Sequence, residues 1–306
     1  MANTTFSGPV RSENGFVIAN KNTTTGSVTD SSLHSSANKD IRRYYLEEYW
    51  KQRPALNAVA TAPLTDADAT AAANDAIIIA RGIASRDFEV LGTSMTTALC
   101  TFDTTRAGII ITTAGTDQNQ AIIAPHLDTN QSAWQTVLWG TENSVIWECV
   151  VTTAASIADV KLWSGLKLTN DQLIITDADQ AYFKFQTDAT NSEAFSDFTL
   201  LHFVHSIADT DYISALPITV AADTQYHLKI EINSDRKAAI YVNGVQYNVT
   251  TTSGSTGGTA VTTGIERTAA LTNDVDLIPY IGVETGAGSA KALKVHAQAI
   301  SRLIFE

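Results

Sequence analysis

Two glutamates in strand-like segments are the residues best suited to acid–base chemistry. Glu148 lies in VIWECVV and Glu231 lies in KIEIN. Glycoside hydrolysis needs two carboxyl groups that face each other across a cleft. Neither glutamate belongs to a motif that fixes such a pair, and the sequence has no Gly-x-Ser-x-Gly elbow, P-loop or dinucleotide fingerprint. We therefore expect a protein that is not an enzyme, and a glycosidase that uses Glu148 or Glu231 is the alternative.

Acidic and amide side chains gather in two short groups that could supply hard oxygen ligands. The residues concerned are Asn170, Asp171, Asp177, Asp179, Asp209 and Asp211. Calcium prefers carboxylate and carbonyl oxygens as ligands. Neither group has the ordered spacing of an EF-hand loop, and aspartates are common in solvated turns. We expect no cofactor, with calcium as the alternative.

Histidines and cysteines form no metal-binding pattern. His202 and His205 stand three apart in LLHFVH, so in a strand they point to opposite faces. Cys100 and Cys149 lie in apolar runs without a Cys-x-x-Cys pair. Free cysteine is among the residues most often buried. We expect ordinary histidines and two buried free thiols.

The elements that must position these residues are strands. From Ala76 to the C-terminus, runs of apolar or alternating residues follow one another, bounded by Gly, Asn, Asp or Thr, with no long amphipathic helix between them. YHLKIEIN alternates apolar and polar residues with the period of a half-buried strand. Asn243-Gly244 between two such runs predicts a hairpin with a type I′ turn. We expect an all-β fold, an antiparallel two-sheet jelly-roll sandwich over residues 76–306.

The sequence before residue 76 has a different composition. Residues 1–39 are rich in Asn, Thr, Ser and Gly, with too few apolar residues to fold alone, which predicts an extended N-terminal arm. KDIRRYYLEEYWKQRP predicts a short amphipathic helix at about 39–53, capped by Asn38 or Asp40 and ended by Pro54. This completes an arm-and-helix region over residues 1–54. Residues 55–75, rich in Ala, Asp and Thr, are expected to form a linker.

The aromatic side chains of this region suggest an interface. At helical spacing, one face of the predicted helix gathers several apolar residues, and such a stripe packs either on its own sandwich or between subunits. Both alternatives stay open. The predicted assembly interface consists of Phe6, Phe16, Ile41, Tyr45, Leu46, Tyr49 and Trp50.

The charge and hydropathy of the chain limit the classes of partner that it can bind. The chain has 20 Lys and Arg against 32 Asp and Glu, a net charge of −12, which opposes binding to a phosphate backbone. Its N-terminus lacks the features of a signal peptide, and no apolar run reaches the roughly 20 residues that cross a bilayer. We expect neither nucleic acid nor membrane as a partner.

Two stretches resemble known proteins. WECVVTT, VKLWSGLKLTN, DADQAYFKFQTD, YHLKIEIN and YVNG follow one another as in the concanavalin-like jelly rolls of lectin and laminin-G-type domains, over roughly residues 87–306. The opening MANTTFSGPVRSENGF, joined to this β body, resembles virion structural proteins of tailed bacteriophages, particularly short-tailed phages of marine bacteria.

The second resemblance implies an assembly role. It implies a homo-oligomeric virion protein that decorates or cements the capsid through its arm. Its partners would be the major capsid protein or other virion proteins, and its location the capsid surface after synthesis in the host cytoplasm. The alternative is a carbohydrate-binding, lectin-like module in a tail, a fibre or host-surface adhesion, with a glycan as partner.

Overall fold

The computed structural model describes residues 19–21, 28–30, 42–59, 85–125, 138–188, 193, 195–254, 257–286 and 288–304. The chain divides into two compact units, Met1–Lys39 and Asp40–Glu306. In the first unit, β1 (Ala19–Lys21) pairs antiparallel with β2 (Val28–Asp30). The rest of the predicted arm lies outside the described residues.

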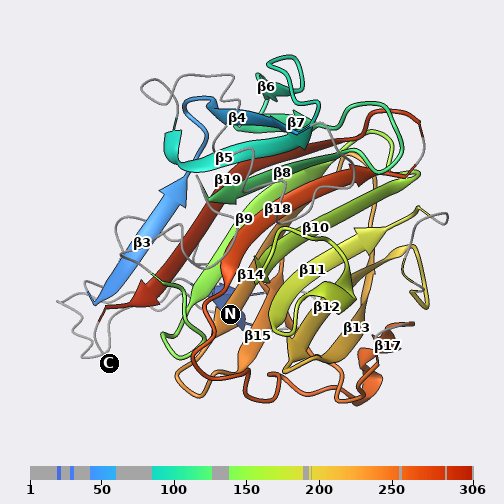
Figure 1. The fold of residues 1–306 in the computed structure, drawn as a ribbon. Coiled ribbons are helices and arrows are strands. Elements are labelled where there is room, and N and C mark those ends of the chain that lie inside the picture. Colours follow the sequence, from blue (N-terminus) through green and yellow to red (C-terminus); the bar gives the residue numbers. More distant parts are fainter. Residues whose placement is uncertain are drawn as a thin grey trace, which may run out of the picture. The chain divides into compact units, whose positions relative to one another are not determined.

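The second unit is built almost entirely of strands, which form two sheets (Figure 1). The nine-stranded sheet has the order β17-β13-β12-β11-β10-β18-β8-β5-β4. Its strands are β4 (Pro54–Val59), β5 (Ser85–Thr93), β8 (Gln120–Pro125), β10 (Val160–Lys167), β11 (Gln180–Gln186), β12 (Leu200–Ile207), β13 (Thr210–Thr219), β17 (Thr259–Ala260) and β18 (Ile278–Thr285).

The eight-stranded sheet has the order β16-β15-β14-β9-β19-β7-β6, with β3 paired to β19. Its strands are β3 (Arg43–Glu48), β6 (Cys100–Phe102), β7 (Ile109–Thr112), β9 (Ile146–Thr153), β14 (Gln225–Ile232), β15 (Ala238–Val242), β16 (Val245–Tyr247) and β19 (Ala292–Leu303). The described helices are two short 3-10 turns, η2 (Ile174–Thr176) and η3 (Val261–Thr263). Neither is long and apolar enough to cross a membrane.

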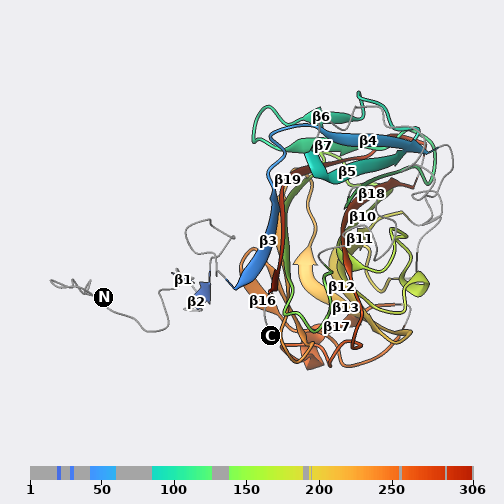
Figure 2. The same ribbon diagram turned by 60° about the vertical axis from the view of Figure 1, so that its left-hand side comes forward.

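The two sheets lie face to face and enclose the main core (Figure 2). All pairs of neighbouring strands are antiparallel except β4 with β5 and β13 with β17, which are parallel. The predicted fold class, an all-β two-sheet jelly-roll sandwich, is therefore confirmed, with the two parallel pairs at the edges of the nine-stranded sheet.

Local predictions for the body also hold. In β14 every second residue is buried, from Tyr226 to Ile232, as the alternation predicts. Asn243 and Gly244 have φ of 51° and 77° and join β15 to β16 in the expected hairpin. Cys100 and Cys149 are buried free thiols. Burial raises the pKa of the Cys100 thiol to about 12.

The helix predicted at about 39–53 is wrong. Residues 43–48 form β3 instead, which pairs with the C-terminal half of β19. Its aromatic residues favour a strand, and β19 offers an edge whose hydrogen bonds a helix could not use. A spacing of three and four over so few residues cannot exclude a strand, and Leu46 is the single buried residue of β3.

The chain crosses between the two sheets at Trp50. This residue has φ of 54°, which is strained for a bulky side chain, and its exposed fraction is 1%. Its ring centroid lies 6.0 Å from that of Phe88 in β5, and its backbone N donates to Glu48 Oε1 at 2.7 Å. The sandwich thus includes residues 42–59, which the sequence analysis assigned to the helix and to the start of the linker. The remainder of that linker lies outside the described residues.

Candidate functional site

Polar side chains cover the side of the nine-stranded sheet that faces away from the eight-stranded sheet; we call this side the polar face. Strand pairing sets Gln120, Glu284, Lys161 and Gln186 in one row across β8, β18, β10 and β11. Successive residues of a strand point to opposite faces, so Lys161 and Lys167, six residues apart in β10, share this face. An apolar cluster separate from the main core lies between the polar residues, and it includes Trp163, Tyr182, Ile174 and Tyr280.

Lys161 and Glu284 form the first buried ion pair of the polar face. Lys161 Nζ lies 2.5 Å from Glu284 Oε1 and 3.5 Å from Asp188 Oδ2, and these three side chains are at most 2% exposed. Gln120 Nε2 donates to the other oxygen of Glu284. Burial raises the pKa of the Glu284 carboxyl, while the charge of Lys161 works in the opposite direction.

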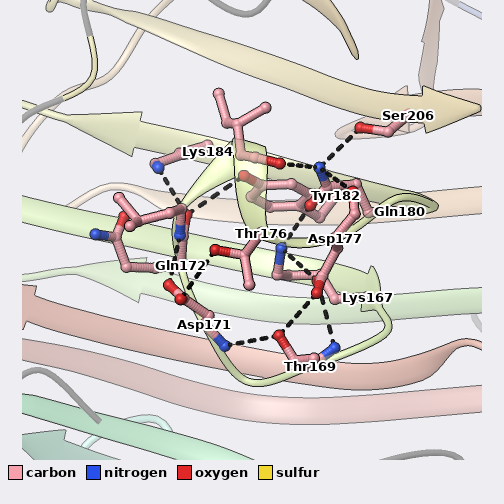
Figure 3. Close-up of polar contacts among 12 residues, drawn as sticks. Lys167, Thr169, Asp171, Gln172, Thr176, Asp177, Gln180, Tyr182, Lys184 and Ser206 are labelled. Carbon is pink, nitrogen blue, oxygen red and sulfur yellow. Dashed lines mark hydrogen bonds and ion pairs between the residues drawn. The ribbon is translucent and has the colours of Figure 1, made fainter. Parts of the chain in front are cut away.

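Lys167 forms the second pair, with a residue that is not in a strand (Figure 3). Its Nζ lies 2.9 Å from Asp177 Oδ2, and both side chains are fully buried. The same Nζ donates to Gln180 Oε1 at 2.5 Å and lies 4.4 Å from the centre of the Tyr182 ring. Gln180 Nε2 in turn donates to Ser206 Oγ at 2.8 Å. The ammonium is therefore held by an aspartate, an amide and an aromatic ring.

Lys184 forms the third pair. Its Nζ donates to a carboxylate oxygen of Glu193 and, at 2.7 Å, to the backbone oxygen of Gln172. Burial lowers the pKa of Lys184, and the neighbouring Glu193 carboxylate opposes that shift. The lysine side chain has no exposed surface, so its charge depends on these two partners among the described residues.

Residues 169–179, which we call the cover segment, lie over the polar face and carry η2 (Figures 1 and 3). Asp171 holds the segment together, because Oδ1 accepts from the backbone N of Leu173 and Oδ2 from Thr176 Oγ1, both at 2.9 Å. Ile174 is buried in the apolar cluster of the face, whereas Ile175 is 73% exposed. One apolar side chain and the ion pair of Asp177 thus fix the segment to the sheet.

Several polar atoms between the cover segment and the sheet have unused hydrogen-bonding capacity. Among the described residues they find no partner although they are buried: Trp163 Nε1, Asn170 Oδ1 and Nδ2, Gln172 Oε1 and Gln186 Oε1. Buried polar groups are nearly always hydrogen-bonded to protein or to ordered water. Such atoms occur both in the strands of the polar face and in the cover segment.

The carboxylates considered for calcium have other partners. Asp177 accepts from Thr169 Oγ1 at 2.8 Å in addition to its lysine. Asp179 accepts from the backbone N of Ala208 and from Thr272 Oγ1, and Asp211 accepts from Ser206 Oγ. Within the described ranges, no three His, Cys, Asp or Glu side chains are grouped to hold a metal ion. The expectation of no cofactor stays a prediction.

The two strand glutamates lie on the outer side of the other sheet. Glu148 Oε2 lies 2.8 Å from His227 Nε2, and the glutamate is 1% exposed. Glu231 lies 3.5 Å from Lys229 Nζ and 3.8 Å from Arg267 Nη2. Lys229 is paired with Glu148 in the strand register, so the two carboxylates are diagonal neighbours beside cations. This arrangement leaves the non-enzymatic expectation as a prediction.

The predicted assembly residues have different environments. Leu46 and Trp50 are 7% and 1% exposed in the core of their own chain, which is the first of the two alternatives for the aromatic stripe. Tyr45 is half-buried, and Tyr49 is exposed. Phe6, Phe16 and Ile41 lie outside the described residues.

The two strand histidines point to opposite faces, as expected. His202 stacks on Phe195 of the polar face at 4.2 Å between ring centroids, and His205 stacks on Tyr212 at 4.7 Å. His205 also lies beside Phe203, which belongs to the main core. The polar face was not predicted from the sequence, although one signal was present. The apolar run VKLWSGLK holds two lysines an even number of residues apart, and the run QAYFKFQ holds a third.

The fold and the strand order define an all-β, two-sheet jelly-roll sandwich. No family model and no curated protein matches the sequence. Solved structures that share the arrangement include a protein of unknown function from Shewanella oneidensis MR-1, with 7% identity and a TM-score of 0.48, covering 85% of this chain and 86% of that one. An alginate lyase from Corynebacterium sp. has 10% identity and a TM-score of 0.43, covering 70% and 93%.

A third similar structure is the carbohydrate recognition domain of Emp46p in its metal-free form. It has 6% identity and a TM-score of 0.42, and the match covers 70% of this chain and 87% of that chain. At this level of similarity the three structures say nothing about what the present chain binds, so its function is argued from its own residues.

Proposed function

We propose that this protein is a carbohydrate-binding module whose site is the polar face of the nine-stranded sheet. The observation that carries the proposal is the set of buried polar atoms without partners, among the described residues, in two strands of the polar face (Trp163 and Gln186) and in the cover segment (Asn170 and Gln172). Carbohydrate sites combine an aromatic surface with a few fixed polar groups. The polar face has both kinds of residue, and its Trp163 and Tyr182 are buried, so a ligand reaches them only when the cover segment moves. The reaction chemistry of an enzyme is not required for this role.

The energetics of the buried ion pairs favour a functional reason for them. A buried ion pair contributes little net stability, because the cost of removing two charges from water offsets their attraction, and apolar residues of similar volume are often as good or better. If the only role of this sheet face were to hold a loop in place, apolar side chains would stabilise the contact at least as well. The pair of Lys161 and Glu284 and the pair of Lys167 and Asp177 therefore suggest selection for binding.

Trp163 has the position of an aromatic platform. Its indole lies directly on the backbone of Gly282 in the next strand, where a Cβ atom would come within 2.1 Å of the ring. Glycine at this position lets the indole lie flat against the sheet. Lys184 is the register partner of Trp163 on β11, Lys161 stands two residues before it in β10, and the indole Nε1 is unpaired among the described residues.

The test compares two tryptophan substitutions. Trp163→Phe keeps an aromatic ring but removes the Nε1–H donor and part of the platform, so we expect binding to a panel of oligosaccharides to weaken about tenfold or more. Trp147→Phe is the matched control, because Trp147 is equally buried with an unpaired Nε1 but lies in the core between the sheets. Isothermal titration calorimetry and melting temperatures give the affinities and the stability of each variant.

The outcomes separate binding from stability. If Trp163→Phe loses affinity while Trp147→Phe keeps it and both remain folded, the polar face is the site. Equal affinities for the wild-type protein and both variants would place the glycan elsewhere. The absence of binding to every glycan in the panel would refute the proposal.

The virion role implied by the resemblance of the N-terminus stays a prediction. It depends on an arm of which only β1 and β2 are described. Tyr49 is the member of the predicted interface that is exposed in the described residues. A carbohydrate-binding sandwich and a virion location are compatible, since the sequence analysis already considered a glycan-binding module in a tail or fibre.

A further inference from the structure

We propose that the ligand of the polar face is an acidic oligosaccharide, and that Asp177 and Glu193 occupy the positions of its carboxylates while the site is closed. This inference rests on the proposed carbohydrate site and adds the chemical class of its ligand. It is argued from where the carboxylates that pair with the three buried lysines stand in the fold.

The three lysines obtain their counter-charges from different places. Lys161 pairs with Glu284, which stands opposite it on the neighbouring strand, so this pair belongs to the sheet itself. Lys167 and Lys184 pair with Asp177 and Glu193, neither of which is in a strand. Two of the three cations are therefore neutralised by residues that lie over the sheet and not in it.

The two pairs are linked through the cover segment. Glu193 Oε1 accepts from the backbone N of Ile174, at 2.6 Å, while its other oxygen accepts from Lys184. Lys184 also donates to the backbone oxygen of Gln172. Asp177, at the far end of the same segment, holds Lys167. Moving the segment off the sheet therefore breaks the ion pair of Lys167, removes the Gln172 oxygen from Lys184, and takes from Glu193 its contact with the backbone N of Ile174.

Opening the segment has a charge requirement. Lys167 and Lys184 are completely buried, and a buried cation without a partner is costly. A neutral sugar that displaced the segment would leave Lys167 without a counter-charge and Lys184 with that of Glu193 alone. A sugar with carboxylates would replace that of Asp177 and compete with that of Glu193, so the exchange of one anion for another makes opening feasible. The closed form thus selects for an acidic ligand.

The experiment frees one lysine without removing the segment. Glu193→Gln keeps an oxygen for the backbone N of Ile174 but removes the negative charge that pairs with Lys184. Asp171→Asn is the matched control, because Asp171 contacts Leu173 and Thr176 of the cover segment and pairs with no lysine in the described residues. Calorimetry with an oligogalacturonate and with a neutral maltooligosaccharide of the same length measures each affinity, and melting temperatures verify folding.

We expect Glu193→Gln to bind the oligogalacturonate about fivefold more tightly than the wild-type protein, since the ligand no longer competes with an internal carboxylate. Asp171→Asn should change that affinity less than twofold, and neither substitution should favour the neutral sugar. Asp177→Asn repeats the test at Lys167 and replaces the first variant if that one does not fold.

Three results would overturn the inference. An unchanged or lower affinity of Glu193→Gln for the oligogalacturonate would show that the carboxylate does not stand in for the ligand. An equal gain for Asp171→Asn would mean that loosening the segment is enough. If the protein binds only the neutral sugar and Trp163→Phe abolishes that binding, the proposed carbohydrate site stands and the acidic ligand is refuted. If the protein binds neither sugar, both proposals are refuted.

Discussion

His205 shows how a single residue couples this fold to pH. Its ring is stacked between Phe203 and Tyr212, with Nδ1 unpaired among the described residues. Burial lowers the pKa of His205 to about 3, and burial lowers that of His202 to about 4, against a backbone hydrogen bond with Leu200 that raises it. Both histidines are neutral in the folded protein at pH values where the unfolded chain already carries protons.

The sign of the pH dependence follows from these pKa values. Between an unfolded pKa of about 6.5 and the folded values, the unfolded chain binds protons that the folded chain does not, so the free energy of unfolding decreases as the pH falls. The contribution is complete above about pH 6.5 and is lost progressively toward pH 4. Each fully shifted histidine contributes about 1.4 kcal/mol per pH unit in that window.

We predict that His205→Phe weakens this dependence. The phenyl ring preserves the stack with Tyr212 and removes the titrating group, so the free energy of unfolding should fall less steeply between pH 6 and pH 4, by about 1 kcal/mol per pH unit. Urea unfolding of the variant and of the wild-type protein at pH 7, 6, 5 and 4 measures both slopes. Parallel curves would show that His205 is protonated in the folded state.

At the scale of elements, β3 determines where the folded body begins. Residues 43–48 complete the eight-stranded sheet, and Trp50 packs on Phe88 of the nine-stranded sheet. The first 39 residues form a separate unit. A truncation that keeps β3 and a truncation that removes it should therefore differ sharply in stability.

We predict that deletion of residues 1–39 leaves a cooperatively folded body with a melting temperature within a few degrees of the full chain. Deletion of residues 1–54 removes β3 and Trp50, and loss of one fully buried tryptophan alone costs about 3–5 kcal/mol, so this shorter chain should be strongly destabilised or unfolded. Calorimetric melting of the two truncations makes the comparison. A stable product of the longer deletion would mean that β3 is dispensable.

The sequence predicted some elements well because their signals are local. The alternation in β14 and the Asn243-Gly244 turn depend on neighbouring residues and were correct. The nature of β3 depends on the free edge of β19, some 250 residues away in sequence, and was missed. The positive φ of Trp50 has no sequence signal, since it results from the crossing between the two sheets.

At the scale of the whole molecule, the polar face needed tertiary information. Alternating lysines within a strand usually indicate a solvated face, and only the position of the cover segment turns Lys167 and Lys184 into buried, paired cations. Asp177 drew attention as a metal ligand because its type and its loop suit calcium, while its partner is a lysine ten residues earlier in the chain. The sequence shows which residues are charged, but it does not show which of them pair.

The central claim is that this sandwich binds carbohydrate on the polar face of its nine-stranded sheet. Hydrogen–deuterium exchange of the full chain, with and without saturating oligogalacturonate, tests it most directly. We expect altered exchange in β10, β11 and residues 169–179, with β14 and β15 of the other sheet unchanged. Changes confined to β14 and β15, or no change anywhere at saturating ligand, would contradict the account.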